Sequence, residues 1–236
     1  MDSGAFHCPN CKDNKDYQKK YVQNWFTLYW IPIFPVGEKK NEHIECDACS
    51  NIYHTDVIDY KPGLNEKEID KWIEEAEENG ELAIDTETSS LDAHQADLIG
   101  VSLSTKIGKA CYIPIGHNSG TCIKKEIVIK KLKTLLEDKS VKKIGQNIKF
   151  DFIVLNNHGI EMSSMEDTML MSYVLDAGKN RHNMDTLSEI HLNHKTISFK
   201  ELVGSGKNQI NFNEVELNKA MEYAAEDADI TYRLYK

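Results

Sequence analysis

The sequence predicts an α/β fold in which a mixed sheet flanked by helices follows a small β-rich segment. The composition, with 40% hydrophobic and 28% charged residues, is that of a globular protein. Short alternating apolar segments and four of the six cysteines precede residue 60, whereas long periodic segments follow it. Lys61-Pro62-Gly63 separates the two parts, because Pro and Gly interrupt regular elements. We therefore expect two domains, residues 1–60 and residues 61–236.

The second part contains strand-like runs first and helical segments later, with one β–α–β step, an order that predicts a mixed sheet. Alternating apolar residues indicate strands, and apolar residues three or four apart indicate helices. The expected strands cover 82–86, 98–104, 110–115 and 143–145. The expected helices cover 65–78, 124–136, a segment from 148, 167–175, 184–191 and 213–235.

The formal net charge of −10 argues against a protein that coats nucleic acid without specificity, because such proteins are basic. The chain has two arginines, Arg181 and Arg233, so phosphate contacts would come mainly from lysines. Residues 1–24 lack the apolar stretch of a signal peptide. The most apolar run, residues 25–36, is too short to span a bilayer. We expect a cytoplasmic protein with no membrane partner.

Two C-x-x-C pairs lie in the first part, Cys8 with Cys11 and Cys46 with Cys49. A two-residue spacer lets both thiolates of one turn bind the same tetrahedral ion, and two such turns complete a structural zinc site. In a reducing cytoplasm, clustered cysteines indicate metal ligands rather than disulfides. Redox dithiols, disulfides and unliganded core cysteines are the alternatives.

This segment resembles a small zinc-ribbon family in which C-P-x-C is followed by an aromatic stretch with an I-P-x-F-P-x-G centre and then by C-x-x-C. Here that centre is residues 31–37. We expect one structural Zn²⁺ held by the four cysteines, although His7 and His54 lie beside the pairs and could replace a thiolate. The aromatic stretch is either the core of the ribbon, which we favour, or a docking surface.

Three short patterns in the second part carry polar side chains. Asp85 and Glu87 close the first expected strand and share one of its faces, since side chains two apart on a strand point the same way. Asn147 and Asp151 are four apart at the start of a helix, and Tyr223 and Asp227 are four apart on the last helix. Each pattern alone is weak. The remaining acids of the last helix are interpreted as a solvated face: Glu222, Glu226 and Asp229.

In the order D-x-E, N-x-x-x-D and Y-x-x-x-D, these patterns resemble the exonuclease motifs of the DEDD superfamily, and the tyrosine is typical of its DEDDy branch. The closest similarity is to the 3′→5′ proofreading domain of bacterial DNA polymerase I. It covers about residues 64–236. The similar segments are GKACYIPIGH (108–117), VKKIGQNIKFD (141–151), DTMLMSYVLDAG (167–178), HKTISF (194–199) and YAAEDAD (223–229).

The resemblance implies a ribonuclease-H-like fold and two Mg²⁺ or Mn²⁺ ions that activate water and stabilise the leaving 3′-oxygen. Asp85 would bridge both ions, while Glu87 and Asp227 would complete the shell of the first. Asp151 would support the second ion, directly or through water. The Tyr223 hydroxyl would orient the attacking water; with a reference pKa of about 10, it suits a positioning role better than that of a free base.

Substrate contacts are carried over from the same resemblance, residue by residue. The residues concerned are Leu91, Gln146, Asn147, Lys149, Phe150 and Arg181. Leu91 would wedge against terminal bases, and Arg181 would contact a phosphate. Phe150 stands where the family commonly has a tyrosine, so it keeps a stacking surface without the hydroxyl. Core packing is the alternative for Leu91 and Phe150.

We therefore expect a metal-dependent exonuclease that shortens single-stranded DNA from the 3′ end to nucleoside 5′-monophosphates, without polymerase activity. Its partners would be DNA 3′ ends and a polymerase or another replication or repair protein bound through the zinc ribbon. The alternatives are an exonuclease that trims RNA 3′ ends and a catalytically silent module that binds nucleic acid or a partner. The presence of all five motif residues argues against the silent module.

Overall fold

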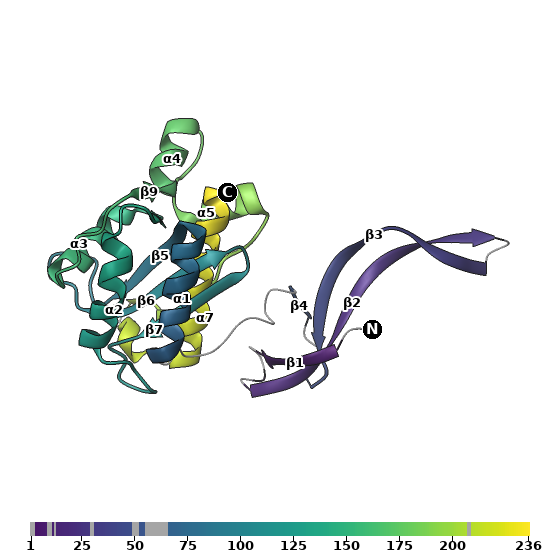
Figure 1. Cartoon of the computed structure of the whole chain (residues 1–236), viewed down its shortest axis with the longest axis horizontal. Coiled ribbons are helices and arrows are strands. Elements are labelled where there is room, and N and C mark those ends of the chain that lie inside the picture. The colour runs from purple at the N-terminus through teal and green to yellow at the C-terminus, as the bar shows by residue number, and fades with distance from the viewer. Residues whose placement is uncertain are drawn as a thin grey trace. The chain divides into compact units, whose positions relative to one another are not determined.

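The computed structural model describes residues 3–8, 11, 13–28, 31–48, 52–54, 66–206 and 209–236. The chain divides into two compact units, Met1–Tyr60 and Lys61–Lys236 (Figure 1). We call them the N-terminal unit and the C-terminal unit. Among the described residues, no helix is both long enough and apolar enough to cross a membrane.

The N-terminal unit contains an antiparallel sheet whose strands follow chain order. The strands are β1 (Ser3–Cys8), β2 (Asp13–Leu28), β3 (Ile31–Cys46) and β4 (Ile52–His54). Cys11 lies on a turn between β1 and β2 and is half-buried. Cys49 and the side chains of Cys8 and Cys46 lie outside the described residues, as do the side chains of the aromatic stretch. The zinc site therefore stays a prediction.

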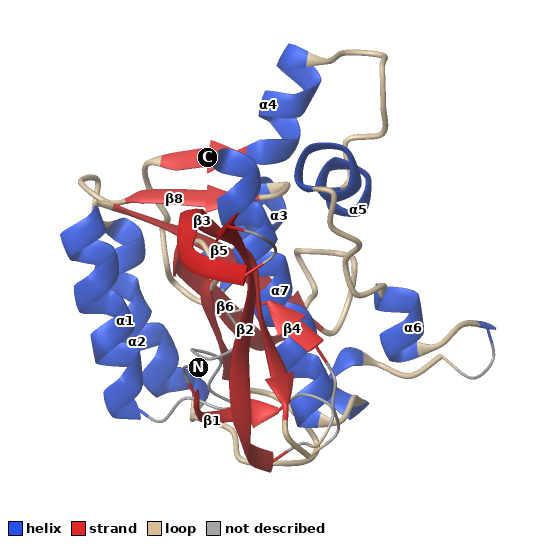
Figure 2. Ribbon diagram, turned by 90° about the vertical axis from the view of Figure 1, so that its right-hand side faces the viewer, coloured by secondary structure: helices blue, strands red, loops and turns tan. Residues whose placement is uncertain are grey.

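The C-terminal unit is built on a five-stranded mixed sheet in the order β7-β6-β5-β8-β9. Its strands are β5 (Glu81–Thr88), β6 (Leu98–Lys106), β7 (Lys109–Pro114), β8 (Lys142–Gly145) and β9 (Met165–Asp167). Antiparallel pairs join β5 to β6 and β6 to β7, whereas β5, β8 and β9 run parallel. The predicted mixed sheet flanked by helices is confirmed (Figure 2). In the strand order, β5 lies at the centre of the sheet.

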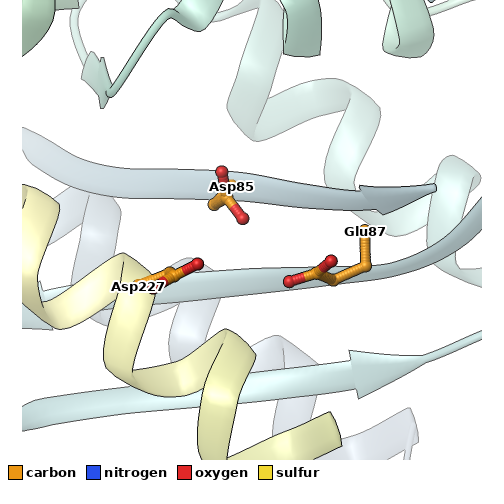
Figure 3. A group of neighbouring side chains, drawn as sticks. All are labelled: Asp85, Glu87 and Asp227. Atoms are coloured by element: carbon orange, nitrogen blue, oxygen red, sulfur yellow. The ribbon is translucent and has the colours of Figure 1, made fainter. Parts of the chain in front are cut away.

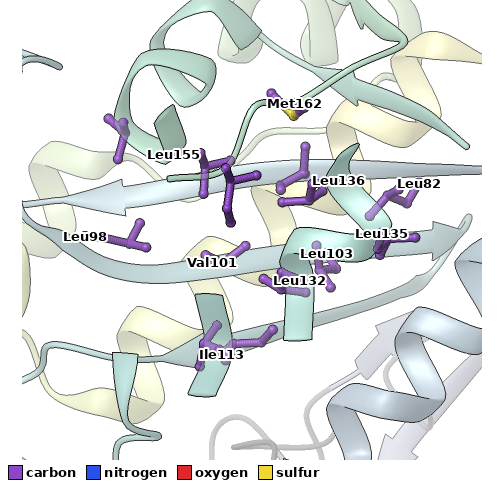
Figure 4. Close-up of a cluster of buried hydrophobic side chains, with 14 of the residues drawn as sticks. Leu82, Leu98, Val101, Leu103, Ile113, Leu132, Leu135, Leu136, Leu155 and Met162 are labelled. Carbon is purple, nitrogen blue, oxygen red and sulfur yellow. The ribbon is translucent and has the colours of Figure 1, made fainter. Parts of the chain in front are cut away.

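Helices cover both faces of this sheet. They are α1 (Glu66–Asn79), α2 (Lys125–Glu137), α3 (Ile148–Asn157), α4 (Thr168–Leu175), α5 (Met184–Leu187), α6 (Phe199–Val203) and α7 (Leu217–Tyr235). The main core lies on one face, where Leu82 and Ile84 of β5 are fully buried among side chains of α1, α2 and α3 (Figure 4). On the other face, Ala83 packs with Ile144 and with Tyr232 of α7. Alternate residues of β5 thus belong to different layers.

The structure differs from the sequence expectation at three places. Asp167, which we expect at the start of a helix, is instead the last residue of the three-residue strand β9 and the N-cap of α4. The segment after Met184 continues as a π-turn over Ser188–Leu192. The last helix begins at Leu217 rather than residue 213, because Phe212–Glu214 forms a separate 3₁₀ turn closed by a capping box.

Candidate active site

Asp85 and Glu87 lie near the end of β5 on the same face of the strand. The residues that alternate with them, Leu82 and Ile84 among them, face the main core. Because β5 is the central strand, between β6 and β8, both carboxylates lie over the sheet rather than at its edge. Asp85 is half-buried and Glu87 is 7% exposed.

A third carboxylate, that of Asp227, comes from α7, which packs against the sheet on the same face as Asp85 and Glu87 (Figure 3). Small side chains on α7 let its backbone approach the sheet closely. The buried alanines of α7 are Ala220, Ala224, Ala225 and Ala228. One carboxylate oxygen of each acid lies within 4.8 Å of those of the other two. The structure therefore brings together three of the four predicted metal-binding acids, from two elements far apart in sequence.

Burial raises the pKa of these three carboxyls and that of Asp151 on α3. It raises the pKa of Asp85 to about 7, because a buried charge has lost its hydration. Burial raises the pKa of Glu87 well above its ordinary value, and the charges of Asp85, Asp227 and Asp151 add to the effect. For Asp227 and Asp151, burial comes first and the charge of Asp85 second. A bound cation would favour the charged carboxylates and reverse these shifts.

Asp151 lies on the first turn of α3 and is 2% exposed. Thr86, between Asp85 and Glu87 on β5, holds it with two hydrogen bonds to one oxygen. The Thr86 amide donates to Asp151 Oδ1 over 3.0 Å, and the Thr86 hydroxyl donates to the same atom over 2.6 Å. Asp151 is outside the group of three carboxylates, and its Oδ2 is the oxygen that it can offer to a ligand.

Tyr223 lies one turn before Asp227 on α7 and is half-buried. Its hydroxyl donates a hydrogen bond to the Asp227 carboxylate. Burial, followed by the negative charges of Asp227, Glu87 and Asp85, raises the pKa of Tyr223 far above its ordinary value. The phenol therefore stays protonated at neutral pH and can act as a hydrogen-bond donor.

The acidic group fits a divalent cation. Within the described residues, the buried Oε1 of Glu87 has no hydrogen-bond partner. Burying such an oxygen is costly unless a proton or a cation satisfies it. The donors that surround the position are all carboxylate oxygens, which suit hard ions such as Mg²⁺ and Mn²⁺.

Asp167 fixes the turn that leads into α3. Asn147, the N-cap of that helix, adopts a left-handed conformation with φ of 65°, which is uncommon outside glycine. The Asp167 carboxylate accepts hydrogen bonds from the amides of Asn147 and Ile148, each over 3.1 Å, and from that of Met169 over 2.9 Å. One side chain therefore caps both α3 and α4, and it holds the segment that carries Asn147 next to Asp151.

The predicted substrate contacts on this segment take different positions. The Gln146 amide is engaged within the protein, since it donates to the backbone oxygen of His182 over 2.8 Å and accepts from the Thr168 hydroxyl. Lys149 is exposed, whereas Phe150 is half-buried and packs against the main core. For Phe150, the structure thus shows the core packing that was the alternative to substrate contact.

The other two predicted contacts lie on the surface. Leu91 is 94% exposed, so core packing is wrong for this residue. Arg181 is exposed in the loop between α4 and α5. The structure does not place either side chain in the group formed by the three carboxylates.

The interpretation of Glu226 and Asp229 as a solvated face is wrong. Glu226 accepts from the Ile197 amide over 2.6 Å and is bonded to His194 Nε2 over 2.8 Å. Asp229 accepts from the Gly108 amide over 2.6 Å. Glu226 and Asp229, which precede and follow Asp227 in α7, therefore each hold a loop against this helix through hydrogen bonds. Their partners are distant in sequence, so the spacing of the acids along the helix did not indicate this role.

Sequence reasoning also missed Phe199, which lies close to Tyr223. Its ring is 42% exposed, parallel to that of Phe212 at a centroid distance of 6.4 Å, and 5.9 Å from the Tyr223 ring. The only signal was its place in the segment HKTISF, which resembled the polymerase domain. Thr86 and Asp167 were likewise not singled out.

The profile of the 3′-5′ exonuclease family matches residues 60–236, which is three quarters of the chain. The chain belongs to the 3′-5′ exonuclease family. The C-terminal unit is therefore the exonuclease domain, and its acidic cluster is the candidate active site of a nuclease.

Among curated relatives, DNA polymerase I of Rhizobium leguminosarum is 45% identical over 188 residues, which cover 71% of this chain. The match spans only 18% of that polymerase. Among solved structures, NrnC of Brucella melitensis with bound Mg²⁺ is 27% identical and covers 66% of this chain and 70% of that one, with a TM-score of 0.51. The same protein has been solved bound to pGG.

A more distant solved structure shows the fold alone. RNase D of Escherichia coli, an exoribonuclease involved in structured RNA processing, is 17% identical, covers 75% of this chain and 44% of that one, and has a TM-score of 0.54. These similarities confirm the ribonuclease-H-like fold expected from the motifs.

Proposed function

We propose that the exonuclease domain is a metal-dependent enzyme of the DEDDy type that hydrolyses single-stranded DNA from the 3′ end and releases nucleoside 5′-monophosphates. The observation that carries the proposal is the group of Asp85, Glu87 and Asp227, in which one carboxylate oxygen of each acid lies within 4.8 Å of those of the other two. Tyr223 lies one helical turn before Asp227 on α7. Family membership supports the direction of hydrolysis. The similarity to a DNA polymerase supports DNA as the substrate.

In this proposal, the three carboxylates hold a pair of Mg²⁺ or Mn²⁺ ions together with Asp151. Bound divalent ions supply an activated water and stabilise the leaving 3′-oxygen. Thr86 keeps Asp151 oriented, so that its Oδ2 faces a ligand. Tyr223 remains protonated and positions the attacking water through its hydroxyl, anchored by Asp227.

Trimming of RNA 3′ ends is the second candidate. It is favoured by the fold shared with RNase D, an exoribonuclease. The N-terminal unit has no assigned activity. We propose that it binds one Zn²⁺ through Cys8, Cys11, Cys46 and Cys49 and docks a polymerase or another replication or repair protein.

The enzymatic proposal is tested with 5′-labelled single-stranded DNA and RNA of one sequence, with Mg²⁺ or with a chelator. We expect stepwise shortening that requires Mg²⁺ and is faster on DNA. Asp85→Asn should lower the rate by about a thousandfold, since loss of cation binding removes several kcal/mol of transition-state stabilisation. The matched control is Asp97→Asn, an exposed aspartate next to β6.

Three outcomes decide between the candidates. Shortening that survives Asp85→Asn contradicts the assigned site. Faster shortening of RNA than of DNA supports the RNA-trimming candidate. If neither strand is shortened while the Asp97→Asn and unaltered proteins bind DNA equally well, the exonuclease fold is a silent binding module.

A further inference from the structure

The Tyr112 side chain of β7 lies beside the Glu87 carboxylate of β5, two strands away. Pairing of the three strands places Asp85, Ser102 and Tyr112 in one cross-strand row. Glu87 and Gly100 are opposite each other in the next row. Because residues two apart on a strand point the same way, both rows lie on the face of the sheet that carries the candidate active site.

Gly100 allows the Tyr112 ring to extend from its own row into the row of Glu87. A Cβ atom added at Gly100 would lie 2.0 Å from the phenol oxygen of Tyr112 and 2.2 Å from its Cζ. Non-bonded carbon atoms lie about 3.5–4.0 Å apart, so the phenol occupies the space that a side chain at position 100 would take. Directly opposite residues have Cβ atoms about 4.5–5.5 Å apart, and the phenol is therefore the cross-strand neighbour of Glu87.

His117 holds the phenol in this position. Its Nε2 lies 2.7 Å from the Tyr112 hydroxyl, and its ring packs against that of Phe212 at a centroid distance of 5.6 Å. Tyr112 is 2% exposed. A buried ring that is hydrogen-bonded at its tip cannot turn away from Glu87 without losing that bond, and burial makes the loss costly.

The phenol covers Glu87 without satisfying it. Within the described residues, no hydrogen bond joins Tyr112 to Glu87, and the buried Oε1 of Glu87 has no partner. Burial raises the pKa of Tyr112 and the charge of Glu87 raises it further, which indicates that the two groups are close. The ring excludes water that would otherwise hydrate the carboxylate from this side. The charge of Glu87 is therefore left for a proton or a cation to compensate.

We propose that Tyr112 is a positioning residue, whose phenol over Gly100 keeps water from Glu87 and holds that carboxylate toward the other two acids of the cluster. The inference rests on the proposed function, because it assumes that the cluster binds divalent ions. A carboxylate with no competing partner binds a cation more tightly, and a held carboxylate meets the near-ideal geometry that Mg²⁺ requires. Removing the phenol should therefore weaken cation binding and reduce hydrolysis as a consequence.

The test measures Mg²⁺ binding to the full chain by isothermal titration calorimetry, for the unaltered protein, Tyr112→Leu and Gly100→Ala. Leucine lacks the ring atoms that a Cβ at position 100 would meet, whereas Gly100→Ala displaces the phenol. We expect each variant to weaken Mg²⁺ binding about tenfold, the low end for residues that support metal ligands. The double variant should bind Mg²⁺ no more weakly than Tyr112→Leu alone, because the added Cβ no longer meets a phenol.

Two further measurements exclude a merely structural role. Tyr112→Phe keeps the ring over Gly100 but loses the hydrogen bond to His117, so its Mg²⁺ affinity should lie between those of the unaltered protein and Tyr112→Leu. Raising the Mg²⁺ concentration should restore most of the hydrolysis that Tyr112→Leu loses when Mg²⁺ is limiting. A loss of hydrolysis that persists at saturating Mg²⁺, with unchanged Mg²⁺ affinity, would contradict the proposal.

The matched control is Ile113→Val, because Ile113 is the next residue of β7, is fully buried and belongs to the main core on the other face. It should leave Mg²⁺ affinity unchanged. The proposal is overturned if Tyr112→Leu binds Mg²⁺ no more weakly than Ile113→Val, or if the losses of Gly100→Ala and Tyr112→Leu add in the double variant. If Tyr112→Leu does not fold, Tyr112→Phe decides: it must bind Mg²⁺ more weakly than Ile113→Val.

Shortening of labelled strands, measured separately, distinguishes this inference from the proposed function. If the unaltered protein binds Mg²⁺ but shortens no strand, the proposed function fails and the titrations still decide whether Tyr112 positions Glu87. If the unaltered protein binds neither Mg²⁺ nor Mn²⁺, the acidic cluster is not a metal site and the inference is overturned with it.

Discussion

Thr86 links the two layers of the exonuclease domain at the candidate active site. Its neighbours in β5, Asp85 and Glu87, face α7, whereas its own side chain faces α3 and holds Asp151 with two hydrogen bonds. A single residue thus sets the position of the fourth carboxylate relative to the other three. Proteins need such supporting contacts because carboxylate ligands must be held closely to their productive geometry.

Thr86→Val should lower the rate of hydrolysis while leaving the fold intact. Valine keeps the branched shape but removes the hydroxyl that donates to Asp151 over 2.6 Å. A hydrogen bond to a charged group contributes about 1.5–3 kcal/mol, so we expect kcat to fall by roughly tenfold or more. Single-turnover hydrolysis of a labelled strand at saturating Mg²⁺ measures the effect.

Thr88→Val is the matched control, since Thr88 lies on the same strand and its hydroxyl donates to the Ser90 backbone oxygen instead. It should leave kcat unchanged. Equal losses in both variants would show that strand packing, rather than the orientation of Asp151, sets the rate.

Mg²⁺ binding should weaken as the pH falls below neutrality. In the metal-free protein the pKa of Asp85 is about 7, so below that pH the carboxyl holds a proton that must leave before the oxygen can bind a cation. Each displaced proton weakens binding about tenfold per pH unit, and the raised pKa values of Glu87 and Asp227 should add to the dependence due to Asp85. Calorimetric titrations in buffers of different ionisation enthalpy would report both the affinity and the protons released.

The same pKa shift has a predictable sign for folding. Because Asp85 has a higher pKa in the folded protein than in the unfolded chain, its contribution to stability decreases as the pH rises from about 4 toward 7 without metal. Added Mg²⁺ should therefore raise Tm more at alkaline than at acidic pH. In Asp85→Asn, the pH dependence of the Mg²⁺-induced rise in Tm should be reduced. An unchanged pH dependence would show that a group other than Asp85 causes it.

One carboxylate organises the N-termini of two helices. Asp167 caps both α3 and α4, and it sustains the left-handed conformation of Asn147. Asp167→Ala should lower the free energy of unfolding by about 2 kcal/mol, since each lost N-cap costs about 1 kcal/mol. It should also slow hydrolysis, because the turn next to Asp151 loses its anchor. Chemical denaturation and the strand assay measure the two effects.

The control for this prediction is Asp138→Ala, which removes a carboxylate that bonds the Ser140 amide on an exposed turn after α2. It should have a smaller effect on stability and none on hydrolysis. If Asp167→Ala destabilised the protein no more than Asp138→Ala, the double cap would not contribute as proposed.

Long elements with clear periodicity could be predicted from the sequence, and short ones could not. The expected helix over 124–136 and strand over 98–104 lie within two residues of α2 and β6 at both ends. By contrast, β9 and α6 have three and five residues, which is too few to show a period. Their positions depend on pairing with β8 and on packing beside α7, which are contacts between distant segments.

Within the site, too, an arrangement that depends on one element could be predicted, and one that depends on distant partners could not. The spacing within one element places Asp85 and Glu87 on a common face, and similarity to a known family assigned Asp227 to the same site. The roles of Thr86 and Glu226 depend on partners 65 and 29 positions away, Asp151 and Ile197. Sequence spacing carries no information on such pairs.

The chain contains an exonuclease domain and a small antiparallel unit. Its family match covers residues 60–236 and therefore excludes nearly all of the N-terminal unit. The two units also differ in the metal chemistry that we propose, since thiolates select zinc and carboxylates select Mg²⁺ or Mn²⁺. Each metal should therefore stabilise its own unit.

Because the two units are separate, we expect that deleting residues 1–60 changes the rate of Mg²⁺-dependent hydrolysis of short strands by no more than about twofold. The carboxylates and the contacts that support them all lie after residue 61. The deleted chain should contain no zinc, whereas the full chain should contain one zinc ion, which elemental analysis would measure. Cys11→Ser in the full chain should lower the zinc content without altering hydrolysis. If the variant that lacks residues 1–60 is unfolded, or if Cys11→Ser leaves the zinc content unchanged, the proposal that two metal sites stabilise separate units is contradicted.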